Sequence, residues 1–245
     1  MRNTVKLLID NLRTFLRDKF HQYDVTLPYI ITVIVALIVV VGGINLFIEL
    51  TETLKSDVLA DFDYKITEYV ISHRSAALTK YFVFVTHVGD VYGYAFVLIV
   101  FAIISYFVLK QWKLMLQVFF VLALSAISNL ILKRFVDRAR PGIEHMVSVE
   151  TLSYPSGHAM SAMAFYGFLM YLIYRFNINR YLKIGVMLLL GILILSIGIS
   201  RIYLGVHFPS DIAGGFIAGF IWVVFCILIF DLIEVFRRDP QTPTV

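Results

Sequence analysis

The chain has 245 residues, of which 60% are hydrophobic and only 16% charged, and its mean hydropathy is +0.84. This apolar share is far above that of soluble domains, so the composition predicts an integral membrane protein. The formal net charge of +4 comes from short basic clusters beside apolar stretches, which is typical of membrane topology and argues against nucleic-acid binding. The single cysteine, Cys226, lies in an apolar stretch and excludes an intramolecular disulfide.

The N-terminal segment, residues 1–26, combines basic and apolar side chains at helical spacing. This pattern indicates an amphipathic helix on the cytoplasmic face of a membrane. Neither an early apolar core nor a small-residue cleavage site is present, so a signal peptide is not predicted and the first span is expected to be retained.

Six apolar segments follow, each close to the roughly 20 residues that are needed to cross a bilayer. They cover residues 27–50, 91–109, 114–132, 155–176, 181–199 and 212–233. The sequence therefore predicts an all-α fold, an integral membrane bundle of six transmembrane helices. We expect one membrane domain at residues 27–236 and a short tail at 237–245.

The stretch between the first two spans has the pattern of an interfacial amphipathic helix. Apolar or aromatic residues recur every three or four positions at Leu59, Phe62, Ile66, Tyr69 and His73. Asp57, Asp61 and Asp63 lie largely elsewhere. We interpret them as a solvated face and not as a metal site, because no second acidic cluster would complete an oxygen cage.

Basic residues set the expected orientation of the bundle. With the N-terminus inside, more than half of the 21 lysine and arginine residues fall on the inner side, so both termini are expected in the cytoplasm. Three polar segments, at residues 133–141, 154–158 and 200–211, then share the outer side. We expect an active site where they meet.

The first polar segment carries two cations. Lys133 and Arg140 are seven residues apart and share one helix face if the third span continues as a helix up to Pro141. Phosphate is a natural partner for such a pair, because a guanidinium offers a two-pronged fork and an ammonium a point charge. Contact with lipid headgroups explains this segment alone equally well.

The second polar segment, residues 155–158, opens the fourth span. Amides at a helix N-terminus bind oxyanions, and Gly157 has no side chain to block their approach beside Ser156. His158 is then placed to give a proton to a leaving oxygen. The alternative is a hydrogen-bonded histidine at the surface.

The third polar segment supplies Arg201 at the end of the fifth span, where the helix dipole favours a cation. Asp211 falls in the first turn of the sixth span and can reach back to His207, which fixes the tautomer of the imidazole. The alternative is a helix cap beside a topology-setting charge. The three segments together suit phosphoryl transfer through a phosphohistidine, with cations doing the work of a metal ion.

The order and spacing of these residues resemble the type 2 phosphatidic acid phosphatase superfamily of membrane lipid phosphate phosphatases. The resemblance implies that His207 is the nucleophile, Asp211 its orienting carboxylate and His158 the general acid. It also implies that phosphate is bound by Lys133, Arg140, Ser156, Gly157, Ser200 and Arg201. By the same resemblance, no metal or other cofactor is needed, and the site faces the outer leaflet.

The expected partners are a lipid phosphate substrate and the surrounding membrane lipids, without nucleic acid. Polyprenyl diphosphate, phosphatidic acid and phosphatidylglycerophosphate are the candidate substrates. A phosphotransferase with another acceptor, and a non-enzymatic membrane anion carrier or lipid-binding protein, remain as alternatives. The absence of an Asn-x-Ser/Thr acceptor favours a bacterial inner membrane. Residues outside the motifs are interpreted as surface residues, with a role in headgroup choice as the alternative: His87, Asp90, Arg134, Asp137, Arg138, Glu144 and His145.

Overall fold

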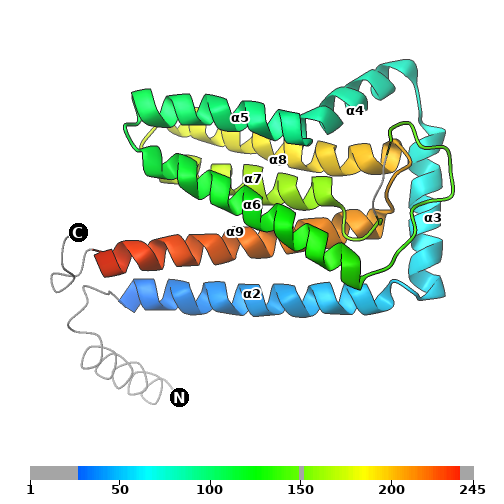
Figure 1. The fold of residues 1–245 in the computed structure, drawn as a ribbon, viewed down its shortest axis with the longest axis horizontal. Coiled ribbons are helices and arrows are strands. Elements are labelled where there is room, and N and C mark those ends of the chain that lie inside the picture. Colours follow the sequence, from blue (N-terminus) through cyan, green and yellow to red (C-terminus); the bar gives the residue numbers. More distant parts are fainter. Residues whose placement is uncertain (1–26, 149–151, 238–245) are drawn as a thin grey trace, which may run out of the picture. The chain divides into compact units, whose positions relative to one another are not determined.

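A computed structural model describes residues 27–148 and 152–237, and this part of the chain is helical without any strand (Figure 1). The helices are α2 (Leu27–Thr53), α3 (Asp57–Ser72), α4 (Ala76–Val88), α5 (Val91–Ile103), the π-helix η1 (Ile104–Val108), α6 (Trp112–Phe135), α7 (Gly157–Arg175), α8 (Arg180–Tyr203) and α9 (Pro209–Arg237). The predicted all-α class is confirmed. The predicted amphipathic segment 1–26 and the tail after residue 237 lie outside the described residues.

Five of the described helical stretches are long and apolar enough to cross a membrane. They are Tyr29–Thr53, Val91–Val108, Trp112–Phe135, Arg180–Tyr203 and Pro209–Val235. They match five of the six predicted spans to within a few residues at each end. A multi-pass membrane protein is therefore confirmed, whereas the count of six spans stays a prediction.

The remaining predicted span, residues 155–176, corresponds to α7, which is the most enclosed helix described. Side chains along its length are buried, and several are small or polar, such as Ala159, Ser161 and Ala164. Helix α7 packs against both α6 and α8. Because protein and not lipid surrounds α7, it needs fewer large apolar side chains than the helices around it.

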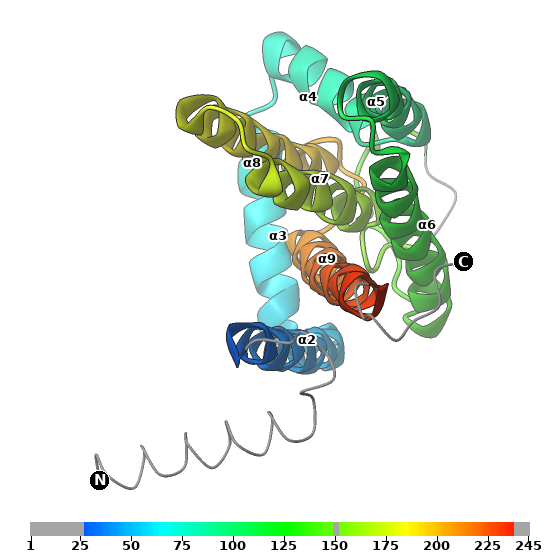
Figure 2. The ribbon, with the colours of Figure 1, turned by 90° about the vertical axis from the view of Figure 1, so that its left-hand side faces the viewer.

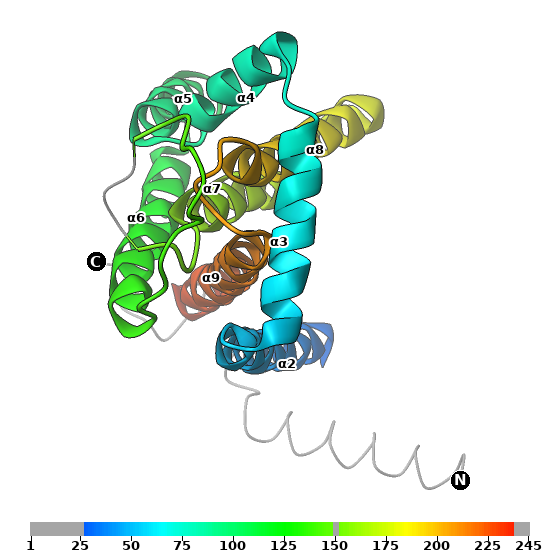
Figure 3. The same cartoon turned by 90° about the vertical axis from the view of Figure 1, so that its right-hand side faces the viewer.

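The described chain forms two compact units, residues 27–41 with 224–237, and Gly42–Val223. The second unit holds every residue discussed below. Within it, α5, α6, α7 and α8 run alongside one another, and α3 crosses one end of them (Figures 2 and 3). The domain boundaries expected from the sequence stay a prediction.

Helix α3 differs from its prediction at Asp63. Ser56 caps its N-terminus by accepting a hydrogen bond from the amide of Leu59. Phe62 and Tyr69 are 53% and 67% exposed, whereas Asp63 and Thr67 are buried. The interpretation of Asp63 as part of a solvated face is therefore wrong, and the ionic partner described below is the physical reason. The interfacial position of α3 stays a prediction.

The turn between α8 and α9 is held in place from two sides. Gly205 adopts φ +81°, and a Cβ atom there would lie 2.7 Å from the carbonyl oxygen of Glu144. Arg74 donates to the carbonyl oxygen of Tyr203 through Nε at 3.0 Å and Nη2 at 2.7 Å, which satisfies a carbonyl in the last turn of α8. The turn thereby carries the chain from Arg201 to His207.

We expect Gly205→Ala to destabilise the protein by about 1–2 kcal/mol, because alanine disfavours the left-handed conformation and its Cβ has no room. Thermal unfolding in detergent measures the loss. The control is Gly191→Ala inside α8, where a Cβ meets nothing within 4 Å, so no loss is expected. Equal melting temperatures for Gly205→Ala and the wild type would contradict this account of the turn.

Candidate active site

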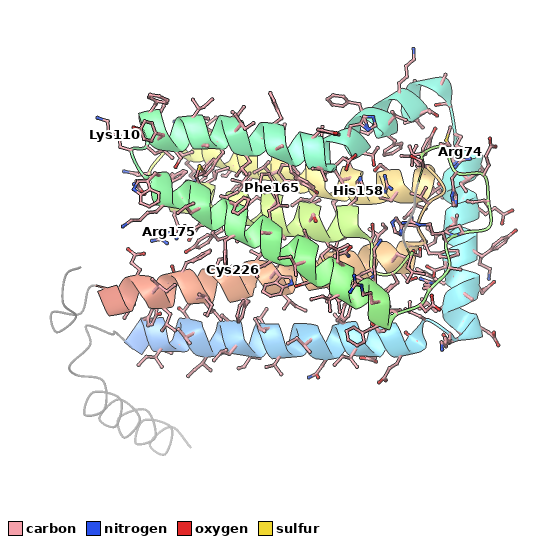
Figure 4. The ribbon with its side chains drawn as sticks, in the orientation of Figure 1. Arg74, Lys110, His158, Phe165, Arg175 and Cys226 are labelled. Carbon is pink, nitrogen blue, oxygen red and sulfur yellow. The ribbon has the colours of Figure 1, made fainter. Side chains whose placement is uncertain are left out.

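A cavity of about 450 Å³ opens where the three predicted polar segments meet. The predicted site residues that line it are Lys133, Arg140, Gly157, His158, Arg201 and His207. Thr86, His87 and Asp90, from the end of α4 and the start of α5, line it as well. In Figure 4, His158 lies toward the end of the Gly42–Val223 unit that carries Arg74, and Lys110 and Arg175 lie at the opposite end.

His207 and Asp211 form a buried pair at the floor of this cavity. Nδ1 of His207 lies 3.3 Å from Oδ2 of Asp211, and the two side chains are 2% and 0% exposed. On the other side of the ring, Nη1 of Arg140 lies 3.2 Å from Nε2. A guanidinium can only donate, so Nε2 must accept and the proton must sit on Nδ1. The tautomer in which Nε2 carries no proton is therefore the one that both neighbours favour.

Lys133 and Arg140 meet, but not through the predicted helix. Helix α6 ends at Phe135, so Arg140 lies in the following loop and the expectation of a helix up to Pro141 is wrong. Both side chains instead converge on the carbonyl oxygen of Leu152, from Nζ of Lys133 at 2.8 Å and Nη2 of Arg140 at 3.4 Å. Arg140 also donates to the carbonyl oxygen of Val206 at 2.7 Å. Tertiary contacts, and not helical spacing, bring the two cations together.

Helix α7 begins at Gly157, within the segment that was predicted to open the fourth span, and Ser156 is its N-cap. Amides in a first helical turn have no acceptor within their own helix and point toward the cavity end. Gly157 lines the cavity, and a Cβ there would lie 2.9 Å from Oδ1 of Asn129. The amide of Ser156 donates to the backbone oxygen of Asp211, and its buried hydroxyl has no hydrogen-bond partner among the described residues.

Arg201 lies in the last turn of α8 and is only 4% exposed. Its Nη1 donates to Oγ1 of Thr86 at 2.6 Å, and its Nε is buried without a hydrogen-bond partner in the described chain. The predicted neighbour Ser200 does not line the cavity, because its hydroxyl donates to the carbonyl oxygen of Ile197 at 2.6 Å. The buried guanidinium of Arg201, with an unsatisfied donor beside the cavity, suits the binding of an anionic ligand.

Burial controls the protonation of the groups in the loops around the cavity. It lowers the pKa of His207 to about 4, although the hydrogen bond and charge of Asp211 act to raise it. The charges of Arg140 and Arg201 lower it further. Burial also lowers the pKa of Arg140, against the opposing effect of Asp211. At neutral pH the site therefore presents a neutral imidazole beside cationic guanidinium groups.

Several polar residues that support the site were missed or misread in the sequence. Ser153 donates to Oδ2 of Asp211 and lies 3.3 Å from Nδ1 of His207. Arg138, interpreted from the sequence as a surface residue, instead donates to Oδ1 of Asp211 at 2.6 Å, so that interpretation is wrong. An isolated serine carries no signal in a single sequence. A signal for Arg138 was its position two residues before Arg140 in a segment already expected to meet Asp211.

The chain is similar to known proteins over most of its length. Residues 114–233 match the family model of the PAP2 superfamily. The chain is 31% identical over 180 residues to phosphatidylglycerophosphatase B of Bacillus subtilis (strain 168). The match covers 71% of this chain and 85% of that protein. The crystal structure of a transmembrane PAP2 type phosphatidylglycerolphosphate phosphatase from Bacillus subtilis superposes with a TM-score of 0.74 at 27% identity, over 81% of this chain and 98% of the other. Aquifex aeolicus LpxE shares the fold, with a TM-score of 0.52 at 21% identity over 67% and 93% of the two chains.

The cationic lining predicts that inorganic phosphate stabilises the protein. We expect phosphate to raise the melting temperature of the wild type in detergent, and Arg201→Gln to reduce that rise, because one buried donor group is lost. Lys183→Gln, in the first turn of α8, is the control and should keep the full rise. An unchanged rise in Arg201→Gln would exclude anion binding at this cavity.

The lowered pKa of His207 predicts a loss of stability on the acid side. The pKa is 6.5 in the unfolded chain and about 4 in the folded one. Below pH 6.5 the unfolded chain therefore binds a proton that the folded chain does not, so stability is lost as the pH falls toward 4. The difference reaches up to about 3 kcal/mol. Melting curves over this range should fall more steeply for the wild type than for His207→Gln, and parallel curves would contradict the assignment.

Proposed function

Because the chain belongs to the PAP2 superfamily, we propose that it is a membrane phosphatase that hydrolyses a lipid phosphomonoester or diphosphate through a phosphohistidine, without a metal ion. Family membership confirms the resemblance seen in the motifs. The observation that carries the proposal is the unprotonated Nε2 of His207 at a cavity lined by Lys133, Arg140 and Arg201.

In the first step, Nε2 of His207 attacks phosphorus, an N–P bond forms, and the bond from phosphorus to the leaving oxygen breaks. Asp211 holds the Nδ1 proton and stabilises the positive charge that develops on the ring. His158 gives its proton to the leaving oxygen. A phosphate anion in the cavity favours the imidazolium form of His158 by charge attraction.

In the second step, water replaces the histidine on phosphorus. His158, now neutral, takes a proton from the water as its oxygen bonds to phosphorus and the N–P bond breaks, which restores His207. The cations around the cavity neutralise the equatorial oxygens in both steps, and the first amides of α7 add donors. This division of labour is why a metal ion is not part of the proposal.

Arg140 can donate to either of two acceptors during this cycle, Nε2 of His207 or a phosphate oxygen. In the structure Nη1 of Arg140 donates to Nε2 of His207 at 3.2 Å. Nε2 can attack phosphorus only after this hydrogen bond is broken. A phosphate oxygen beside Nε2 offers Arg140 a charged acceptor in exchange for a neutral one, which is the stronger hydrogen bond. We therefore expect substrate binding to move the guanidinium from the nucleophile to the phosphate.

A phosphatidylglycerophosphate headgroup is the substrate that we place first, since the Bacillus subtilis relative and the Bacillus subtilis crystal structure each carry that substrate in their names. The orientation with both termini in the cytoplasm and the site at the outer face also belongs to this proposal. Figure 4 is consistent with it, because Lys110 and Arg175, which are expected inside, lie at the end away from His158. A bacterial inner membrane is the proposed location.

The deciding experiment measures phosphate release from phosphatidylglycerophosphate, phosphatidic acid and polyprenyl diphosphate by detergent-solubilised protein in excess chelator. We expect turnover by the wild type and a loss of at least about 10³-fold in His207→Ala, because the nucleophile is removed. His73→Ala is the matched control, since this exposed histidine at the end of α3 lies outside the cavity. Turnover that survives His207→Ala, or that chelator abolishes, would overturn the mechanism.

A further inference from the structure

A second buried carboxylate lies behind the His207–Asp211 pair. Asp63, from α3, is 1% exposed, and its Oδ2 lies 2.7 Å from Nη2 of Arg138. Nη1 of the same guanidinium lies 2.6 Å from Oδ1 of Asp211. One arginine thereby bridges two buried carboxylates from helices that are far apart in the sequence. Neither Asp63 nor Arg138 lines the cavity where the substrate is proposed to bind.

The bridge fixes the rotation of the Asp211 carboxylate. Oδ2 of Asp211 faces Nδ1 of His207 at 3.3 Å and accepts from the amide of Phe208 at 2.9 Å. Oδ1 points the other way and accepts from Nη1 of Arg138 at 2.6 Å. Because a carboxylate is planar, holding Oδ1 sets the direction in which Oδ2 meets the imidazole.

The orientation of Arg138 is itself fixed by contacts with Ser210 and Phe208. Nη1 also donates to Oγ of Ser210 at 2.7 Å, and the guanidinium carbon lies 4.6 Å from the centre of the Phe208 ring. Asp63 accepts from the amide of Ser210 at 2.9 Å and from its hydroxyl. The fork of the guanidinium therefore has one orientation, with one prong on each carboxylate.

Asp63 accepts from an amide in the first turn of α9, but this cap alone does not explain why the residue is charged. Asparagine or serine would serve the Ser210 amide without bringing a charge out of water, and a buried charge costs several kcal/mol unless it is paired. The contrast lies two residues away on the same helix, where Asp61 pairs with Lys65 and both side chains are 59% or more exposed. Such an exposed pair contributes little. The buried charge of Asp63 is matched to that of Arg138.

We propose that Asp63 and Arg138 are positioning residues for the reaction: Asp63 holds Arg138, and Arg138 holds Asp211 in the rotation that directs the Nε2 lone pair of His207 at phosphorus. This inference rests on the proposed phosphatase function. It assigns α3 a part in catalysis although α3 contributes no residue to the cavity lining.

The test compares Arg138→Lys and Asp63→Asn with the controls Arg134→Lys and Asp61→Asn. Lysine keeps the charge of Arg138 but cannot reach both carboxylates at once. Both positioning variants should lower kcat about 10–100-fold with KM changed less than about threefold, because the ground-state contacts to phosphate are untouched. The exposed controls should keep kcat within about twofold. Rates are normalised to the folded fraction from size-exclusion chromatography.

A double variant, Asp63→Asn with Arg138→Gln, separates positioning from general destabilisation, because the charge of Asp63 is removed together with that of its partner. If Asp63 acts through Arg138, the double variant loses no more kcat than Arg138→Gln alone. Multiplied losses, a raised KM at normal kcat, or normal kcat in folded Arg138→Lys would each overturn the inference. If Asp63→Asn fails to fold, Arg138→Lys decides. Wild-type turnover and its loss in His207→Ala, measured in the same assay, test the proposed function separately, and without wild-type turnover both proposals fall.

Discussion

The carboxylate of Asp211 is the point on which the geometry of this protein depends. It is fully buried in the first turn of α9, and its backbone oxygen accepts from the N-cap residue of α7, Ser156. Its side chain is held by the loop that follows α6, through Arg138, and by the loop that precedes α7, through Ser153. Each of these contacts compensates part of the cost of burying a charge, and each fixes one more segment around His207. Burial of this single group therefore assembles the site.

A consequence is that the imidazole can stay neutral among cations. Burial and two guanidinium groups disfavour a protonated His207, and Asp211 only partly offsets them. A neutral ring keeps its lone pair available for phosphorus. The same balance explains why the carboxylate must be rigidly placed: its attraction becomes most valuable when the ring gains charge as the N–P bond forms. The site is arranged for a charge that appears only during the reaction, which is what distinguishes catalysis from tight binding of the ground state.

The sequence was sufficient where spacing and chemistry coincide. Apolar length predicted five spans closely, and the motif residues from Lys133 to His207 were expected at one cavity before any geometry was known. The sequence was insufficient where tertiary contacts decide. The helix carrying Lys133 stops at Phe135, and the loop beyond it reaches the same carbonyl oxygen by a route that no periodicity encodes. Asp63 was misread because its ionic partner Arg138 lies 75 residues away in the sequence, so no local pattern marks this carboxylate as buried.

Helix α7 shows why a membrane environment reverses the usual signal for burial. In water the most apolar helix is the most enclosed, but here the helices with lipid-length apolar stretches are mostly exposed and α7 is enclosed. The interior can carry Ser161 and small residues because close helix packing, and not exclusion from water, holds helices together in lipid. It can also carry the polar start of α7, where Ser156 is the N-cap and Gly157 lines the cavity. Polar residues in an otherwise apolar chain therefore mark the helix that builds the site. A search for spans by hydropathy leaves out α7, although this helix begins at the cavity.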